Sequence, residues 1–394
     1  MIRRSPNSAA RPSGGRAEHA LVLAVALAAV ECAPATQLLD ERTTSPYMAL
    51  RAADDGLLER SHRLDASEPG GPKLHVHARE IGLEHEEGPV IVLLNGIFSD
   101  GRTWRFVTAQ LAAKRRVLVL DLPGTGQSSA PDPESLGAEA YTPRWIARAT
   151  LRALASWQAE APERRELVLV GHSIAGTVTM HLLGSPELGA LHDELDARVV
   201  GAVLIAPADI LTASWSPTLV ELAKLSELEV GFGSAFGVLE SRVEQAIVGS
   251  VEEPERRALG GEATRILESL QDRNRRRASQ AMLRRIRPVR DDDTPIWPEV
   301  RALAEDYERI RAPTLLLWGR RDDALPVSMG EELRGRIPGA ELEVVEGVRH
   351  SVHQEAPYAA ADAIERFASR LQWLGPRPLG TGRMSSVGSS PASP

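Results

Sequence analysis

Six short apolar runs, each ending at a turn, constrain the fold of this chain more than any other feature. Each run is four to seven residues long and continuously apolar rather than alternating. Strands that are buried on both faces of a parallel sheet have this pattern, because neither face of such a strand meets water. The runs cover residues 90–94, 117–120, 167–170, 199–205, 314–317 and 342–345.

Helix-like segments lie between these runs, for example at residues 144–160 and 176–183. Repeated alternation of strand and helix predicts an α/β fold with a doubly wound, mostly parallel sheet. Functional residues of such sheets gather at the carboxyl ends of the strands. The strand ends are therefore the first place to look for a site.

Composition limits the classes of protein to consider. The 394 residues include 46 basic and 54 acidic side chains, which leaves a net charge of −8, and 43% of residues are hydrophobic. These proportions are ordinary for a soluble globular protein with a sizeable core. The acidic balance argues against a nucleic-acid partner, which would call for a basic face. Cys32 is the single cysteine, so an intrachain disulfide is excluded.

The sharpest local motif is Val170-Gly171-His172-Ser173-Ile174-Ala175-Gly176, where a strand ends, a serine follows and a helix begins. A tight strand-to-helix turn around the serine requires very small neighbours, and Gly171, Ala175 and Gly176 meet that need. The turn would expose the Ser173 hydroxyl at a helix N-terminus, where partial positive charge favours a developing anion. The simpler interpretation is a helix start with a serine cap and packing glycines.

A serine hydroxyl needs a base, and the base needs an acid that holds it in place. Asp322 follows the run that ends at Trp318-Gly319, and His350 follows the run that ends at Glu346-Gly347. The chain order is therefore Ser173, Asp322, His350, which is the order of α/β-hydrolase triads. Asp323 and Asp209 are alternatives for the acid. His350 is preferred to His353 as the base, and His172 is interpreted as structural.

On these residues, the chain resembles the α/β-hydrolase superfamily over about residues 70–372. The segment Leu94-Asn95-Gly96-Ile97-Phe98 looks like the oxyanion loop of that family, with Asn95 where the family often has histidine. The resemblance implies that the backbone amides of Ile97 and Ile174 hold the oxyanion. The segment from Asp121 to Ser128 looks like a structural turn of the family.

The activity expected from this pattern is that of a serine hydrolase, cleaving a carboxylic ester or related acyl bond through an acyl-enzyme. Serine at position 173 disfavours the dehalogenation and epoxide-opening reactions of relatives with an aspartate nucleophile. An acyltransferase, a carbon–carbon bond hydrolase, a perhydrolase and a non-catalytic binding protein remain alternatives. The expected partner is a small acyl substrate, and no cofactor or metal is expected.

The domain organisation follows from where the alternation fails. Residues 51–209 and 312–374 form the two parts of the core, and residues 210–311 have helical spacing and no strand run, which predicts a helical cap inserted late in the sheet. Leu225, Val230, Phe232 and Phe236 are candidates for its packing and its cavity. Residues 375–394, rich in Gly, Ser and Pro, predict a flexible tail.

Residues 1–50 predict an export signal or a disordered extension. Arginines precede an apolar run at residues 20–30, which at roughly 16 Å of helix is too short to cross a bilayer. Cys32 stands where a lipid anchor could attach, although Glu31 is a poor neighbour for that processing. We expect a periplasmic, secreted or lipid-anchored protein, with a cytoplasmic location as the alternative.

Two further patterns have ordinary interpretations. His75 and His77 would share one face of a strand, but two histidines are too few for a zinc site. Eight arginines between residues 273 and 290 indicate a solvated helix face, with an acidic substrate group or an anionic membrane surface as alternatives.

Overall fold

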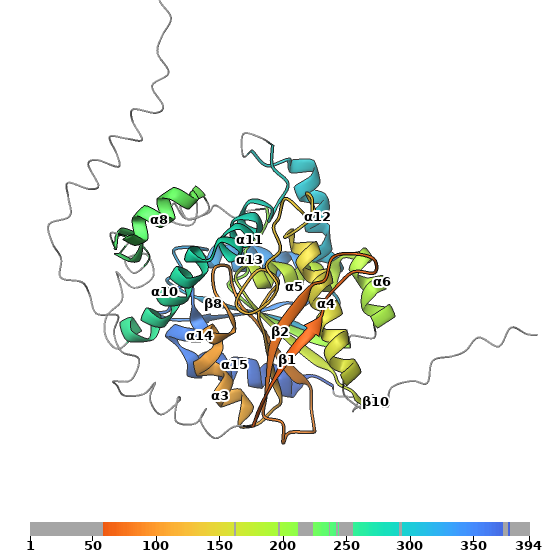
Figure 1. Cartoon of the computed structure of the whole chain (residues 1–394). Helices are drawn as coiled ribbons and strands as arrows, with labels where there is room; N and C mark the ends of the chain where they lie inside the picture. Colours follow the sequence, from red (N-terminus) through yellow and green to blue (C-terminus); the bar gives the residue numbers. More distant parts are fainter. Residues whose placement is uncertain are drawn as a thin grey trace, which may run out of the picture. The chain divides into compact units, whose positions relative to one another are not determined.

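A computed structural model describes residues 58–160, 163–195, 198–211, 224–235, 237–241, 243, 255–290, 294–372 and 377–378 (Figure 1). The expected export segment at residues 1–50, with Cys32, lies outside this range, as does most of the expected tail. Within the described helices, none is both long enough and apolar enough to cross a membrane.

The fold is built on an eight-stranded sheet with the order β1-β2-β4-β3-β6-β7-β8-β9. Strands β3 to β9 of this sheet pair in parallel, whereas β1 and β2 form an antiparallel edge that pairs with β4. The strands are β1 (Glu59–Asp65), β2 (His75–Ile81), β3 (Val90–Leu94), β4 (Val117–Leu120), β6 (Leu167–His172), β7 (Val199–Ile205), β8 (Thr314–Gly319) and β9 (Glu341–Val345). This is the doubly wound, mostly parallel sheet that the apolar runs predict.

Helices cover both faces of the sheet. The helices of the core are η1 (Gly101–Trp104), α3 (Arg105–Ala112), α4 (Pro143–Glu160), α5 (Ile174–Gly184), α6 (Pro186–Leu195), α13 (Val327–Arg336), α14 (Val352–Glu355) and α15 (Pro357–Arg370). Successive strand residues point to opposite faces, so Val168 and Val170 pack with α3 and α15, while Leu167 and Leu169 pack with α4 and α5. Both faces of the central strands are thus buried in apolar cores.

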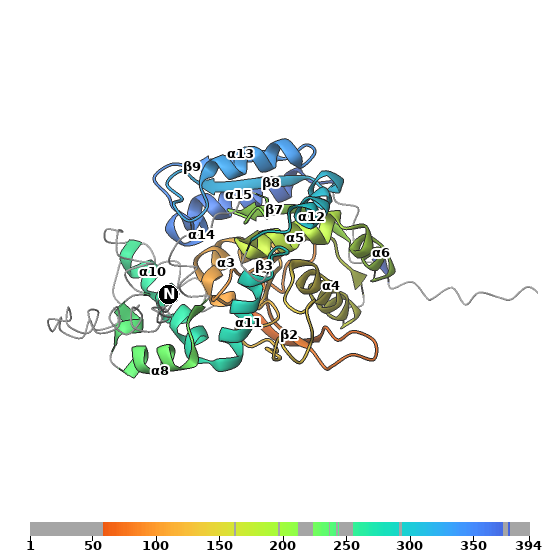
Figure 2. The ribbon, with the colours of Figure 1, turned by 90° about the horizontal axis from the view of Figure 1, so that it is seen from above.

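Four described helices lie between β7 and β8: α8 (Glu227–Ala235), α10 (Glu255–Gln271), α11 (Arg273–Arg284) and α12 (Trp297–Arg309). Figures 1 and 2 show α8, α10 and α11 grouped together, with α12 apart from them and beside α5. Val230 of α8 packs with Ile266 and Leu270 of α10 and with Phe98 from the loop after β3. This apolar cluster joins the inserted helices to the core.

Two details differ from the sequence-based expectation. Arg377–Pro378, within the expected tail, form a two-residue strand β10 that pairs antiparallel with β5 (Glu163–Arg164). The arginines of α11 and the following loop do not form a purely solvated face. Arg277 binds Asp132, Arg285 donates to the main-chain oxygen of Ala140, and Arg287 donates to that of Ile210. These side chains tie the inserted helices to core loops.

Candidate active site

Ser173 occupies a strained turn between β6 and α5, with φ 55° and ψ −119°. A positive φ is unfavourable for a residue with a side chain, and such strain persists only where the surroundings enforce it. A Cβ on Gly171 would lie 2.6 Å from the carbonyl oxygen of Ala175, and a Cβ on Gly176 would lie 2.6 Å from the Cβ of Pro207. The two glycines therefore allow the close packing that forces Ser173 into this turn.

Asp322 and His350 lie on the loops after β8 and β9, and they form a hydrogen bond. His350 Nδ1 lies 2.8 Å from Asp322 Oδ2. The other carboxylate oxygen of Asp322 accepts from the backbone amides of Ala324 and Leu325 at 3.0 and 2.8 Å. The main chain thus fixes the carboxylate, and among the described residues no hydrogen bond to Nε2 of His350 is seen.

The surroundings of His350 favour its protonated form. Burial alone would lower the pKa of His350, but the charge of Asp322 and its hydrogen bond outweigh burial and raise the pKa above its ordinary value. The raised pKa means that the carboxylate of Asp322 stabilises the imidazolium form of His350.

The alternatives for the acid lie elsewhere. Asp323 is exposed, and the hydrogen bond to His350 comes from its neighbour Asp322. Asp209 is fully buried and forms an ion pair with Arg336 of α13, and it also accepts from the backbone amide of Leu211 at 3.1 Å. The geometry therefore brings Asp322 rather than either alternative to the imidazole.

The ring of His172 lies between those of His350 and His353 and contacts both of them. The ring of His172 is 4.8 Å from that of His350 and 4.5 Å from that of His353. His172 Nε2 donates to the main-chain oxygen of His350 at 3.2 Å, and His353 Nε2 bonds to Thr103 Oγ1 at 2.9 Å. Burial, and then the neighbouring imidazoles, lower the pKa of His172 well below its ordinary value. These rings stay neutral and pack around the loop that carries His350.

His172 links Ser173 to His350. It directly precedes Ser173 in the chain, and its ring donates a hydrogen bond to the main-chain oxygen of His350. Within the described residues no hydrogen bond joins the Ser173 hydroxyl to His350 directly. Catalytic hydrogen bonds are often long in the absence of substrate and tighten only in the complex. Asp322 and His350 are thus joined directly, whereas Ser173 is linked to them through its neighbour His172.

The loop after β3 lies against Ser173. A Cβ on Gly96 would be 3.6 Å from the Cβ of Ser173, and Phe98 has a positive φ of 56°. Asn95 shapes this loop, since its amide nitrogen donates to the main-chain oxygens of Gly96 and Ser99 at 2.9 and 3.0 Å. Its amide oxygen accepts from the backbone amide of Leu122 at 3.0 Å. A fully buried asparagine thus ties the loop that carries Ile97 to the turn after β4.

Ile174 is the first residue of α5, so its backbone amide has no partner within the helix. The amide of Ile97 belongs to the loop that abuts Ser173. These two positions correspond to the oxyanion donors implied by the family resemblance.

A buried polar cluster beside this loop was not expected from the sequence. Glu262 of α10 accepts from Arg265 at 2.6 Å and from the side-chain amide of Gln354 at 2.9 Å. Gln354 also donates to Thr103 Oγ1 at 2.8 Å, and Thr103 in turn bonds to His353. The cluster links an inserted helix to the segment just after His350. In the sequence, the pair Glu262 and Arg265 looks like any exposed helical ion pair three residues apart.

This cluster strongly favours the charged form of Glu262. Burial would raise the pKa of Glu262, but the charge of Arg265 and the hydrogen bonds from Arg265 and Gln354 lower it to about 2. Glu262 is therefore a buried carboxylate at any ordinary pH.

Fold and site together define an α/β hydrolase, and comparison with known proteins agrees. The sequence model described as "Alpha/beta hydrolase family" matches residues 91–363, so the chain belongs to that family. An uncharacterised protein of Mycobacterium tuberculosis is 27% identical over 282 residues, covering 71% of this chain and 75% of that protein. A monoacylglycerol lipase of Xenopus laevis is 41% identical over 71 residues, covering 18% of this chain and 21% of the lipase.

Solved structures show the same fold. An esterase from Thermogutta terrifontis superposes with a TM-score of 0.55 at 18% identity, covering 79% of this chain and 98% of the esterase. At that level of identity, the likeness speaks for the fold alone. The family match therefore supports a hydrolase with a small-molecule substrate, and the structural likeness adds only the fold.

Proposed function

We propose that this chain is a serine hydrolase that cleaves carboxylic esters through an acyl-enzyme on Ser173. The observation that carries the proposal is the 2.8 Å hydrogen bond between Asp322 and His350 beside the strained turn at Ser173. A binding protein has no physical need for a fixed carboxylate, an oriented imidazole and a strained serine in one place. The monoacylglycerol lipase that matches 71 residues of this chain supports ester substrates.

In the proposed reaction, Ser173 Oγ attacks the carbonyl carbon of the ester while His350 Nε2 takes the hydroxyl proton. His350 then gives this proton to the departing alkoxide, and the acyl group remains on Ser173. Water then attacks the carbonyl carbon of the acyl-enzyme while His350 Nε2 takes a proton from the water. His350 returns this proton to Ser173 Oγ as the carboxylic acid is released. Asp322 holds the imidazole in the tautomer that leaves Nε2 free, and its charge stabilises the imidazolium.

The backbone amides of Ile97 and Ile174 are assigned to the oxyanion. Ile174 stands at the N-terminus of α5, where the helix dipole also favours negative charge. A single preorganised donor of this kind contributes about 2.7–4 kcal/mol to the transition state. Asn95 takes part only through the loop that it holds.

The helices α8, α10 and α11 are assigned as a cap that forms the acyl-binding wall. The apolar cluster of Val230, Leu239 and Ile266 packs on Phe98, one residue from the proposed oxyanion donor Ile97. An apolar lining favours acyl groups with a hydrocarbon chain. The side chains of Phe232 and Phe236, the other candidates from the sequence, lie outside the described residues.

The decisive experiment is active-site labelling of the full chain with a fluorophosphonate probe, read by peptide mapping. We expect rapid labelling at Ser173, loss of that adduct in Ser173→Ala and in His350→Gln, and parallel loss of 4-nitrophenyl ester cleavage. Asp323→Asn is the matched control and should be labelled like the wild type. A folded wild type that gains no adduct at Ser173 would refute the proposal.

A further inference from the structure

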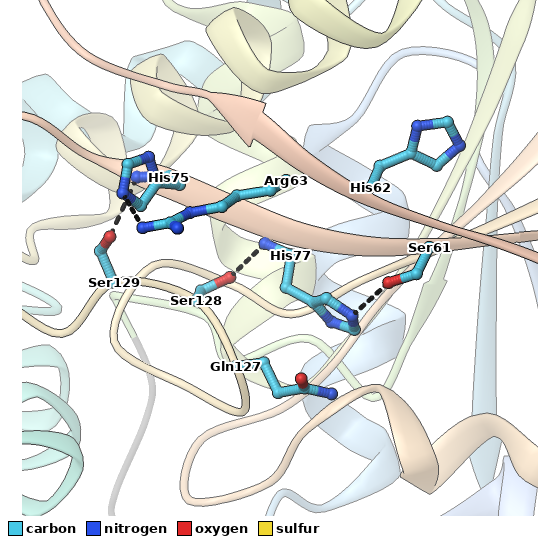
Figure 3. Close-up of a pocket in the computed structure, with 8 residues that line it drawn as sticks. All are labelled: Ser61, His62, Arg63, His75, His77, Gln127, Ser128 and Ser129. Carbon is cyan, nitrogen blue, oxygen red and sulfur yellow. Dashed lines mark hydrogen bonds between the residues drawn. The ribbon is translucent and has the colours of Figure 1, made fainter.

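A polar cavity lies far from Ser173, on the antiparallel edge of the sheet. Its volume is about 450 Å³, and it is lined from β1 by Ser61 and Arg63, from β2 by His75 and His77, and from the loop at residues 127–129 (Figure 3). Three strands separate β1 from β6 in the sheet, which at about 4.8 Å per strand is a distance of roughly 19 Å. This cavity is therefore separate from the candidate active site.

A serine, a histidine and an aspartate form one hydrogen-bonded chain in this cavity. Ser61 Oγ lies 3.2 Å from His77 Nε2, and His77 Nδ1 lies 3.0 Å from Asp121 Oδ2. A carboxylate only accepts hydrogen bonds, so Nδ1 of a neutral His77 carries the proton and donates it to Asp121. Nε2 is then the lone-pair nitrogen that accepts the Ser61 hydroxyl proton. Figure 3 shows the imidazole of His77 directed toward Ser61.

The two supporting residues are held in place. Asp121 is buried and accepts from the backbone amides of Gly101 at 2.7 Å and Gln127 at 2.8 Å. The backbone amide of His77 donates to Ser128 Oγ at 2.9 Å. Ser61 is exposed in the middle of β1, where a substrate can reach it. A fixed acid, an oriented base and an accessible hydroxyl are the parts that activate a serine.

Two guanidinium groups lie on the same face of the sheet as the hydroxyl. Arg79 pairs directly across from Ser61 in the β1–β2 ladder, and Arg63 lies two residues further along β1 on the same face. Arg79 is bound to Glu59 at 3.3 Å, and Arg63 donates to His75. These guanidinium groups favour an electrophile whose oxygen gains negative charge. The polar lining favours a short, polar acyl group over a hydrocarbon chain.

We propose that Ser61, His77 and Asp121 form a second nucleophilic site, which takes up an acyl group from short, polar carboxylic esters. Ser61 Oγ forms a bond to the acyl carbon, and the bond from that carbon to the leaving oxygen breaks. The Ser61 proton passes to His77 Nε2 and then to the leaving oxygen, so no oxidation or reduction occurs. No pair of backbone amides is assigned to hold the oxyanion at this site, so we expect Ser61 to react more slowly than Ser173.

The test uses the full chain with Ser173→Ala, which removes the faster nucleophile. This variant is incubated with a fluorophosphonate probe, and separately with 4-nitrophenyl acetate, and followed by intact mass and peptide mapping. We expect one slow adduct per chain at Ser61, and we expect the total rate of adduct formation to fall at least tenfold in the double variant Ser173→Ala/Ser61→Ala. His77→Gln in the same background should also abolish it, because glutamine keeps a polar contact but is no base.

Ser129→Ala is the matched control, since Ser129 lines the same cavity and its hydroxyl accepts from the backbone amide of His75 at 3.0 Å. It should keep the adduct at Ser61. The proposal is overturned if the Ser173→Ala chain gains no adduct, if the adduct maps elsewhere, or if His77→Gln leaves its rate unchanged. The adduct at Ser61 is measured in a chain that lacks the Ser173 hydroxyl, so the result does not depend on the function proposed for Ser173.

Discussion

Asp322 bonds to His350 through one carboxylate oxygen, while the backbone amides of Ala324 and Leu325 hold the other. Asp322→Asn keeps the size of the side chain but removes its charge and allows the wrong imidazole tautomer. We expect ester cleavage to fall by about 10⁴-fold in kcat, as in triads where this aspartate is replaced by asparagine. Asp323→Asn should leave kcat within about twofold. Equal effects of the two substitutions would remove Asp322 from its proposed role.

The pH dependence of ester cleavage should report on His350. His350 must be neutral to accept the Ser173 proton, and its pKa is raised by Asp322 against the lowering effect of burial. We therefore expect kcat/KM to rise with pH, with a midpoint above the ordinary histidine value of about 6.5. In Asp322→Asn, the remaining activity should have its midpoint at lower pH. A midpoint that does not move between the two proteins would contradict this assignment.

The central strands were predictable because they are buried on both faces. The apolar runs at residues 90–94, 117–120 and 199–205 coincide with β3, β4 and β7. Strand β1 has no such run, because its residues alternate between buried and exposed positions and most of them are polar. A half-exposed antiparallel edge strand leaves only a weak pattern in a sequence.

The candidate site was predictable where it depends on strand ends. Asp322 and His350 follow consecutive strands of a parallel sheet, so their approach follows from topology alone. The contact between Glu262 and Gln354 could not be foreseen, since 92 residues separate them and neither has a local signal of burial. The hydrogen bonds from Ser61 through His77 to Asp121 likewise join β1, β2 and the first residue after β4, and they depend on how these strands pair, which a single sequence does not specify.

The turn at Ser173 should be sensitive to a single methyl group. Gly171→Ala would place a Cβ 2.6 Å from the carbonyl oxygen of Ala175, so the turn must shift. We expect ester cleavage to fall by at least 100-fold, because a shift of about 1 Å in a reacting atom costs this much. Gly189→Ala, in α6, meets no atom within 4 Å and should raise stability by about 0.5–1 kcal/mol with unchanged activity. Kinetics and urea unfolding on both variants check this contrast.

Asn95 should affect both stability and rate. Asn95→Ala leaves the amide of Leu122 and the main-chain oxygens of Gly96 and Ser99 without their partner. We expect a loss of about 1–3 kcal/mol in the free energy of unfolding. We also expect at least a tenfold fall in kcat with little change in KM, because Asn95 acts through the proposed oxyanion loop. A stability loss with normal kcat would mean that this loop does not carry an oxyanion donor.

The buried carboxylate of Glu262 should make stability depend on pH. Its pKa in the folded chain is about 2, below the ordinary 4.5, so it stabilises the fold fully above pH 4.5 and less as the pH falls toward 2. Glu262→Gln leaves Arg265 buried without its ion-pair partner, which should cost about 3–5 kcal/mol near pH 6.

The stability difference between wild type and Glu262→Gln should shrink at low pH, because Glu262 of the wild type then becomes protonated and loses its charge. From the two pKa values, we expect the gap in unfolding free energy between wild type and Glu262→Gln to narrow by about 2 kcal/mol from pH 6 to pH 3. Urea unfolding at both pH values measures it. Glu268→Gln is the control, because Glu268 pairs with Arg102 at the exposed surface and should change stability by under about 1 kcal/mol. A gap that stays constant from pH 6 to pH 3 would show that Glu262 is not held as a buried anion between Arg265 and Gln354.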